Sequence, residues 1–426
     1  MFNPEKGLKK QTIHYAVKCR IYPTDFQKNF FKRQFGCCRL IYNHVLLRLE
    51  KAYKRRRESF SILQAKKFIS PLKKTKRYSF LQEVNSQSLQ ASVFNLGRAR
   101  DRFFKKEGGY PKFKKKAGRQ SFEVPQNFLL NESERRNVFL ILPKLKSAIK
   151  IKRHRKIRGI IRHIVISMEP DGKYYASLNC RSEEYCVILG SFSKKSVLGP
   201  PGLHTPAEGC MGYDLGLADL CVDGDGNKIK APRFLRKSES KLAKAQKNYS
   251  RKKRGSTNKE KARLNIAKKH CKIKHQRRDF THKQSNKIVN KNQVIYFETL
   301  NIKGMMRNHC LAKSVADAML GELVRQVKYK AKWRNRQLIQ IGRFEPSSKL
   351  CSNCGAKNND LKLHHRMWKC NICHALHDRD INAAINIKKI GQGMSEVTPV
   401  ERLTSVGLLK RWSTSWLGTK EAGSGS

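Results

Sequence analysis

Acidic residues are scarce in this sequence. The chain has 426 residues and carries 92 lysines and arginines against 32 aspartates and glutamates, which gives a formal net charge of +60. Repulsion at this charge destabilises a compact fold unless a polyanion neutralises it, and nucleic acid presents about one negative charge per 1.7 Å of duplex axis. The imbalance therefore favours a nucleic-acid partner.

Long apolar runs are also missing. No stretch reaches the roughly 18 apolar residues that a membrane span requires, and the lysine-rich N-terminus lacks the apolar segment of a secretory signal. Many of the 13 cysteines are scattered singly, which suits reduced thiols better than a disulfide framework. We therefore expect a soluble cytoplasmic protein that does not bind a membrane.

The first quarter of the chain predicts a strand followed by helices. Residues 12–22 alternate in polarity, and Pro23 ends the run. Thr24 and Gln27 form a capping-box pair ahead of apolar residues at three- and four-residue steps, and a second helical pattern covers about 85–106. Both patterns carry lysine and arginine on the other face. We interpret residues 24–107 as a basic helical module.

A basic loop and a series of short strands follow. In the loop, aromatic rings alternate with cations, as a bound single strand requires, although a solvated basic turn has the same composition. The residues concerned are Tyr110, Lys112, Phe113, Lys114 and Lys115. Residues 120–190 contain several strand-like runs, which together with 12–22 could form one small β-barrel interrupted by the helices. Residues 191–209 are rich in serine, glycine and proline and are interpreted as a linker.

From residue 210 the pattern becomes α/β. A strand, a hairpin, helices and further strands up to about residue 345 predict a layered mixed sheet, with one amphipathic helix at about 313–337. Residues 237–280 predict a very basic helical hairpin that turns at Gly255. Few acidic residues are available to pair its charges, so we expect it to face phosphates. The turn contains Arg251, Lys252, Lys253 and Arg254.

Two CxxC pairs give the strongest local signal. They are Cys351 with Cys354 and Cys370 with Cys373, separated by fifteen residues. Four thiolates in two loops supply a closed tetrahedral shell for one structural Zn²⁺, without an open catalytic position. Nearby histidines could compete as ligands, but the four cysteines already saturate the metal. These histidines are His364, His365, His374 and His377.

Three isolated carboxylates complete the pattern. Asp214 and Glu298 lie in or at the end of apolar strands, and Asp380 lies in the first turn of a helix that Asp378 caps. Converging at one sheet edge, these carboxylates would repel and raise each other's pKa unless divalent cations bound there. Two Mg²⁺ ions would suit phosphodiester hydrolysis of the kind found in RNase-H-like nucleases.

The motifs and their order resemble the TnpB proteins of bacterial insertion sequences, relatives of the type V CRISPR effector nucleases. GYDLG, YFETLNI, the cysteine pairs and HDRDINAAINI carry the resemblance, together with KCRIYPTDFQ and YNHVL near the start. It implies a metal-dependent, RNA-guided DNA endonuclease with Asp214, Glu298 and Asp380 as catalytic Mg²⁺ ligands. Its partners would be a guide RNA from the transposon end and target duplex DNA. The protein would be located in the bacterial cytoplasm and would associate with the nucleoid when bound to its target.

The resemblance also implies a bilobed layout of α/β, β-barrel and helical modules. A short motif beside the DNA target would be read by the helical module and the barrel, with Gln90 as one contact. The implied parts are a wedge barrel (1–23 and 108–190), a recognition module (24–107), a linker (191–209), an RNase-H-like (RuvC) nuclease domain (210–345), a zinc-ribbon insert that binds target nucleic acid (346–376) and a final RuvC helix (377–390).

Other interpretations remain open at this point. Relatives that have lost the acids act as guided DNA-binding repressors, although all three acids are present here. A zinc-ribbon binding protein without chemistry would leave two acids in apolar strands unexplained, and a transposase is disfavoured because no candidate nucleophilic tyrosine is found. Residues 391–426 show no periodicity and are expected to be disordered, ending in a linker-like Gly-Ser-Gly-Ser. Whether the protein is a monomer or a dimer is not indicated.

Overall fold

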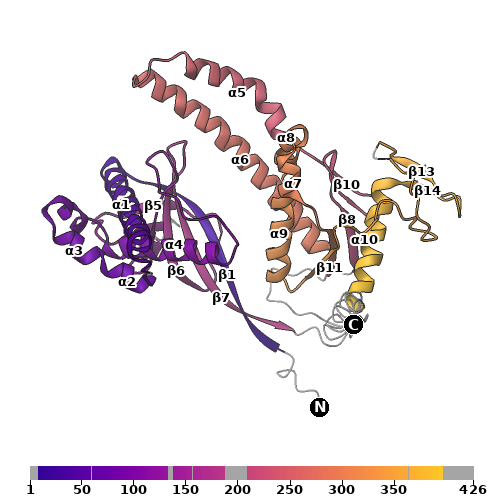
Figure 1. Ribbon diagram of the computed structural model, residues 1–426, viewed down its shortest axis with the longest axis horizontal. Coiled ribbons are helices and arrows are strands. Elements are labelled where there is room, and N and C mark those ends of the chain that lie inside the picture. The colour runs from indigo at the N-terminus through magenta and orange to yellow at the C-terminus, as the bar shows by residue number, and fades with distance from the viewer. Residues whose placement is uncertain are drawn as a thin grey trace, which may run out of the picture. The chain divides into compact units, whose positions relative to one another are not determined.

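The computed structural model describes residues 8–58, 60–132, 138–155, 157–187, 209–362 and 364–396 (Figure 1). The chain forms two compact units. The first comprises Met1–Phe192 and Lys244–Cys271, and the second Ser193–Ala243 and Lys272–Ser426. The expected linker up to residue 208 and the chain beyond 396 lie outside the described residues. Within the described part, no helix combines the length and apolar character that crossing a membrane would require.

The first unit contains a seven-stranded antiparallel sheet in the order β2-β6-β7-β1-β5-β4-β3. The N-terminal strand joins the later strands, as the sequence predicts, although it begins earlier than residue 12. It lies in the middle of the sheet, since β1 pairs with β7 over most of its length and with β5 at its end. Among the described strands no pairing joins β2 to β3, so the pairings define a sheet rather than a closed barrel. The strands are β1 (Leu8–Tyr22), β2 (Gln120–Val124), β3 (Leu129–Glu132), β4 (Val138–Ile141), β5 (Ile149–Lys152), β6 (Ile160–Met168) and β7 (Tyr174–Val187).

Helices inserted between β1 and β2 share one hydrophobic core with this sheet. The longest, α1 (Asp25–Arg56), begins at the predicted capping box: Gln27 N donates to Thr24 Oγ1 at 3.3 Å, and Thr24 N donates to Gln27 Oε1 at 2.9 Å. Phe31 of α1 is fully buried against Phe122 of β2. The other helices are α2 (Ile62–Lys67), α3 (Ile69–Lys74), the 3-10 helix η2 (Lys76–Gln82) and α4 (Ser86–Phe104).

The second unit is built on a five-stranded mixed sheet in the order β10-β9-β8-β11-β12. Strands β8, β11 and β12 are parallel, whereas β9 and β10 are added antiparallel as a hairpin. The buried strand β11 is apolar up to its last residue, as expected for a strand covered on both faces. The strands are β8 (Cys210–Asp214), β9 (Asp219–Asp223), β10 (Lys228–Lys230), β11 (Val294–Glu298) and β12 (Gln337–Ile341).

The basic stretch after β10 is a helical hairpin, as predicted. Helix α5 (Phe234–Ser250) and helix α6 (Thr257–Lys291) run antiparallel and are joined by a turn at residues 251–256 (Figure 1). Gly255 in that turn has a φ of 84°, a conformation that a side chain disfavours. The hairpin is longer than the predicted 237–280 at both ends.

The prediction of one helix at 313–337 is wrong. The chain forms α7 (Ile302–Arg307), α8 (His309–Ala318) and α9 (Leu320–Trp333), and Met319 separates the last two with a φ of 59°. The break follows Asp317, which is buried at 2% exposure and binds Arg277 and the backbone N–H of Leu235. These hydrogen bonds satisfy the buried carboxylate and tie the end of α8 to α5 and α6.

The chain closes with a small two-stranded ribbon and a helix. Strands β13 (Met367–Lys369) and β14 (Leu376–Asp378) pair antiparallel and lead directly into α10 (Arg379–Glu396). The predicted end of this helix at residue 390 is wrong, because it continues to Glu396. Gly391 is needed for packing rather than for termination, since a Cβ there would overlap the ring of Tyr296.

Candidate active site and metal centre

Asp214 and Glu298 lie at the same end of neighbouring parallel strands. Asp214 is the last residue of β8 and Glu298 the last of β11, and the pairing of Phe297 with Tyr213 sets them level. The carboxyl ends of parallel strands are where α/β sheets place ligands. The apolar residue directly before each acid is buried and helps to hold the strand in the sheet. The end of the strand then sets the position of the carboxylate.

Both carboxylates have raised pKa values. Burial and, next, the charge of Asp380 raise the pKa of Asp214 to about 6, although Arg379, the Leu215 N–H and Arg366 act to lower it. Burial and the charge of Asp214 together raise the pKa of Glu298 to about 7. The backbone N–H of Leu215 hydrogen-bonds both carboxylates and lowers both values. The two acids therefore share one backbone donor.

Neither Asp214 nor Glu298 has an ion-pair partner among the described residues. Half-buried carboxylates without a direct ion pair suit a divalent cation, and oxygen ligands are those that Mg²⁺ prefers. In the described part of the chain, the four cysteines are the only group of three or more His, Cys, Asp or Glu ligand atoms within 4.8 Å of one another. The three acids as they stand therefore do not form a single-ion cage.

Asp380 is in the first turn of α10 and is held by an arginine. Arg366 Nη1 donates to its Oδ1 at 3.2 Å and to its Oδ2 at 3.3 Å. The predicted helix cap is confirmed, because Asp378 Oδ1 accepts from the N–H of Asp380 at 3.0 Å and of Ile381 at 3.3 Å. Lys228 pairs with the other Asp378 oxygen at 2.6 Å. Asp378 is thus structural, which leaves the Asp380 carboxylate free of a capping role.

Helix α10 packs closely on β8, which brings Asp380 towards Asp214. A Cβ on Gly212 would overlap the carbonyl oxygen of Ala384 and lie 2.7 Å from Lys388 N. Only glycine lets the helix approach the strand this closely. The pKa of Asp214 reflects the approach, since Asp380 is its largest charge influence.

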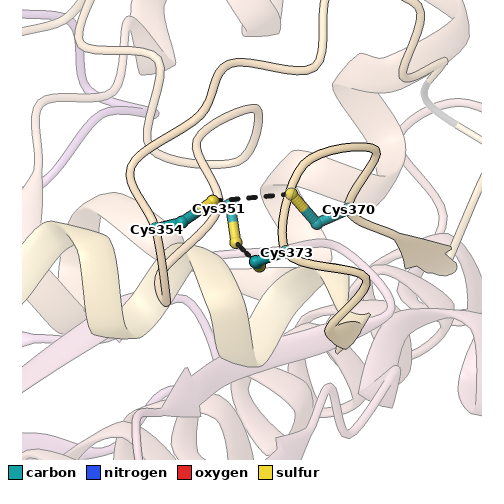
Figure 2. Close-up of side chains that lie close together, drawn as sticks. All are labelled: Cys351, Cys354, Cys370 and Cys373. Carbon is teal, nitrogen blue, oxygen red and sulfur yellow. Dashed lines mark hydrogen bonds between the residues drawn. The ribbon is translucent and has the colours of Figure 1, made fainter.

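The four predicted cysteines come together (Figure 2). Their sulfur atoms all lie within 4.8 Å of one another, with Cys351 to Cys373 at 3.5 Å and Cys354 to Cys370 at 3.6 Å. Four sulfurs around one Zn²⁺ would be about 3.8 Å apart, given Zn–S bonds of about 2.3 Å. The donor set and its spacing therefore fit one structural zinc.

The two cysteine loops have matching backbone hydrogen bonds. Cys351 N donates to Ala356 O at 2.8 Å and Gly355 N to Cys351 O at 2.9 Å. In the second loop Cys370 N donates to Ala375 O at 2.9 Å, and the N–H of the residue after Cys373 donates to Cys370 O at 3.1 Å. Such paired turns orient both sulfurs of each loop to one point. This is the local geometry of a zinc ribbon.

Among the described residues, His377 is the one candidate histidine whose side chain contacts a cysteine sulfur, whereas His374 contacts Cys370 through its backbone N–H. His377 Nε2 lies 3.0 Å from Cys351 Sγ, and its ring lies 4.9 Å from that of Trp368. In the tautomer that carries a proton on Nε2, this ring would donate to the Cys351 thiolate as an outer-shell contact and stabilise the charge on sulfur. His364, His365 and His374 are outside the four-cysteine group.

Two buried asparagines fasten the first cysteine loop to α10. Asn382 Oδ1 accepts from Ser352 N at 2.8 Å and its Nδ2 donates to Leu350 O at 2.7 Å. Asn386 Nδ2 donates to Leu350 O at 2.7 Å and to Ser347 O at 2.8 Å. The metal centre and Asp380 are therefore joined through one helix. Sequence reasoning missed both asparagines, although their spacing of four residues places them on one helix face.

The predicted nucleic-acid residues of the first unit lie mainly at its surface. Lys112 and Lys115 are exposed, and so are Tyr110 and Phe113, at 43% and 45%. Tyr110 packs edge-on against Phe103 at 5.3 Å, and Lys114 Nζ lies 3.9 Å from the centre of the Tyr42 ring. Gln90 is half-buried on α4.

The hairpin turn presents Arg251, Lys252, Lys253 and Arg254, all exposed. Lys259 Nζ donates to Lys252 O at 2.9 Å, and among the described residues no acidic side chain pairs with these four cations. The turn is therefore an open cationic surface.

Arg366 is a further site residue that the sequence did not reveal. It lies in the ribbon beside β13, and its carbonyl accepts from Arg379 N at 2.8 Å. Its charge opposes the rise in the pKa of Asp214, and its side chain binds Asp380. An arginine in so basic a chain gives no sequence signal by itself.

Three sequence families match parts of the chain. The family described as "Probable transposase" (OrfB of IS605) matches residues 204–309, and the Cas12f1-like TNB domain matches residues 321–387. A "Helix-turn-helix domain" family matches residues 13–58, where the structure has β1 followed by the single helix α1. The TNB match includes all four cysteines.

Relatives match over nearly the whole length. A protein of Streptomyces pristinaespiralis described as "Putative RNA-guided DNA endonuclease" is 35% identical over 90% of this chain and 91% of its own. A protein of Escherichia coli K12, "Putative RNA-guided DNA endonuclease InsQ", is 26% identical over 89% of this chain and 92% of its own length. Among solved structures, a Cas12f1-sgRNA-target DNA complex matches with a TM-score of 0.55 at 15% identity, covering 88% of this chain and 99% of that one.

Proposed function

The chain belongs to the TnpB/OrfB family of IS605 elements, which is related to Cas12f, and from this premise we propose that it is an RNA-guided DNA endonuclease. It binds a guide RNA derived from the transposon end and cuts complementary duplex DNA next to a short adjacent motif. The chemistry is metal-dependent hydrolysis of a phosphodiester bond. The wide match to relatives described as putative RNA-guided DNA endonucleases supports the guided endonuclease activity in this proposal.

The position of Asp214 and Glu298 is the observation that carries this proposal. The sheet order, with two parallel strands beside the first strand and an antiparallel hairpin on its other side, suits an RNase-H-like (RuvC) nuclease domain. Its carboxyl edge holds two half-buried acids with raised pKa values and no ion-pair partner among the described residues. Perturbed carboxylates at such an edge favour a catalytic role.

Asp214, Glu298 and Asp380 would hold two Mg²⁺ ions, with Asp214 in the middle, since the charge of Asp380 raises the pKa of Asp214 and the charge of Asp214 raises that of Glu298. When bound, the ions supply an activated water and stabilise the leaving oxygen of the phosphodiester. The protein's own part is positional. Leu215 N–H orients the two strand-end carboxylates, and the close contact of α10 with Gly212 brings Asp380 alongside.

The remaining parts receive proposed roles in holding nucleic acid. The residues 24–107 module and the sheet that continues it would read the adjacent motif, with Gln90 as one contact. The loop containing Tyr110, Lys112, Phe113, Lys114 and Lys115, and the hairpin turn Arg251–Arg254, would contact phosphates. The zinc ribbon would contact the target nucleic acid. Guide pairing would supply sequence choice, so the protein needs mainly charge and shape.

The test uses the full chain purified with its RNA. The RNA is sequenced to define the guide end, and a duplex carrying the matching target beside a randomised flank is incubated with Mg²⁺. Wild type and Asp225→Asn, which changes an exposed acid of the same unit, should cut. Asp214→Asn should bind RNA and target but not cut. Equal cutting by Asp214→Asn would overturn the metal-site assignment, and binding without cutting by wild type would favour a guided DNA-binding protein.

A further inference from the structure

Gly36 lies in the interior of α1, where glycine destabilises a helix relative to alanine. Packing does not require it. A Cβ at this position would meet only the Arg39 Nη2 atom, at 3.9 Å, an ordinary contact. This contrasts with Gly212, where the fold leaves no room for a side chain. The glycine keeps open a space that the described fold does not fill.

That space is a surface cavity of about 400 Å³. Gly36, Leu40, Asn43 and Leu47 line it from one face of α1, since they recur at steps of four, three and four residues. Phe113 closes it from the loop. Leu47 and Phe113 are 42% and 45% exposed, so the cavity has apolar walls that open to solvent. A volume of this size suits a small planar group.

The loop that carries Phe113 is fastened to α1 on both sides of the cavity. Asn43 Nδ2 donates to Lys114 O at 2.9 Å, and its Oδ1 accepts from Lys114 N at 2.8 Å. At the other anchor, Arg39 Nη1 donates to Gln120 Oε1 at 3.0 Å. These contacts hold the backbone next to Phe113 in place. An exposed aromatic ring held in this way costs little entropy when it binds a partner.

The polar groups of the cavity suit a nucleobase with its phosphate. Burial lowers the pKa of His44, and Arg48 lowers it further, so the ring is neutral at pH 7 and offers one donor and one acceptor. Arg39 supplies a cation at the rim. Lys112, Lys115, Lys116 and Arg119 are exposed on the same loop.

We propose that this cavity binds one unstacked nucleobase, which stacks on Phe113 above Gly36 while its backbone phosphate lies against Arg39 and the loop lysines. Aromatic stacking next to cations is the general means of holding single-stranded nucleic acid. The occupant comes from the guide RNA or from a DNA strand, since both carry a planar base and a backbone phosphate. The inference rests on the proposed function, because it needs a nucleic-acid partner.

Two variants test the site from opposite sides. Gly36→Leu fills the cavity and Phe113→Ala removes the ring, and each should weaken binding of the co-purified RNA or of target DNA about 5- to 100-fold. Gly36→Leu should keep or raise the melting temperature, because leucine favours the helix and its Cβ would make only an ordinary contact with Arg39. The matched control is Phe26→Ala, since Phe26 is 67% exposed on the same helix but outside the cavity.

Photo-cross-linking identifies the occupant. The protein is loaded with its RNA containing 4-thiouridine in one arm, and with target DNA containing 5-iododeoxyuridine in the other, and cross-linked peptides are mapped by mass spectrometry. We expect one nucleotide position, in one arm, to cross-link to Phe113 or His44, and Gly36→Leu to abolish that product.

The proposal is overturned if both variants bind RNA and DNA like wild type and neither arm yields a cross-link to residues 36–47 or 113. A protein that binds nucleic acid at this cavity but never cuts would contradict the nuclease proposal alone. A protein that cuts with its guide, while both variants match wild type in affinity and cross-links, would contradict the cavity alone. A protein that binds no nucleic acid would overturn both.

Discussion

The Nη1 atom of Arg366, in the zinc ribbon, donates to both carboxylate oxygens of Asp380, at 3.2 and 3.3 Å. The carboxylate that α10 contributes to the candidate active site is thus paired with a cation from the ribbon. A divalent ion that binds Asp380 must compete with this contact. The ribbon and the acids are therefore coupled electrostatically as well as through Asn382 and Asn386.

Arg366→Gln should tighten the binding of Mn²⁺, used as a spectroscopic substitute for Mg²⁺, about 1.5- to 5-fold. The size follows from the strength of a half-exposed ion pair, about 0.2–1 kcal/mol. The Mn²⁺ affinity is measured from the electron paramagnetic resonance signal of free Mn²⁺, so the measurement does not depend on cleavage activity. Arg325→Gln, which breaks an exposed pair with Glu322, should leave Mn²⁺ affinity unchanged. Weaker Mn²⁺ binding by Arg366→Gln would show that the arginine supports the ion rather than opposing it.

Asp214→Asn should stabilise the metal-free protein at neutral pH. Because burial raises the pKa of Asp214 from 3.8 to about 6, the native state keeps a proton that the unfolded chain loses between these values. Stability therefore falls as pH rises through this window and stays lower above it. Asparagine does not ionise and therefore avoids this loss of unfolding free energy, which is about 1–2 kcal/mol once screening by solvent is included.

The measurement is the unfolding midpoint in EDTA at pH 3.5 and at pH 7.5. The variant should melt about 2–8 °C above wild type at pH 7.5 and close to it at pH 3.5. Asp225→Asn, at an exposed acid, should follow wild type at both values. A difference of the same size at both pH values would mean that titration is not its cause.

Cys354→Ser should remove the zinc. Three thiolates hold the ion much less tightly than four, and the ribbon has only a small apolar core around Leu361 and Trp368. We expect metal analysis to show about one zinc per chain in wild type and almost none in the variant, with earlier proteolysis within residues 350–376. Cys310→Ser, at an exposed cysteine outside the group, should retain the zinc. A zinc-free variant with unchanged proteolysis would contradict a structural role.

Gly212→Ala should separate α10 from β8. The added methyl group would overlap the Ala384 carbonyl oxygen, which belongs to helix backbone and has little freedom to move. We expect a loss of about 2–4 kcal/mol of stability together with faster amide exchange in α10. Gly393→Ala is the matched control on α10, because no atom lies within 4 Å of its added Cβ, and it should be neutral or stabilising. Equal effects of the two substitutions would argue against close packing at Gly212.

Local chemistry was predictable from the sequence. The Thr24–Gln27 capping box fixes the start of α1 through hydrogen bonds within four residues, and the two CxxC pairs fix the sulfur cluster through their spacing. The strands that end in Asp214 and Glu298 were visible as apolar runs interrupted by a carboxylate. In each case the signal and its cause lie close together in the chain.

Features set by distant contacts were not predictable. The helix breaks at Met319, two residues after Asp317, which pairs with the distant Arg277, and Gly391 lies inside α10 against the distant Tyr296. The role of Arg366 could not be predicted, because nothing in the sequence distinguishes it from the other lysines and arginines, 92 in all. Whether three carboxylates separated by more than 80 residues converge is likewise a property of the sheet order, and a single sequence does not state that order.

The order of these acids along the chain has a consequence for the living cell. Asp380 is on the last helix that the structure describes, and Gly212 on β8 must receive that helix before the site is complete. Translation reaches β8 first and α10 last. On the proposed function, a polypeptide whose synthesis stops before residue 380 lacks the third acid, so such an unfinished product cannot assemble the complete site.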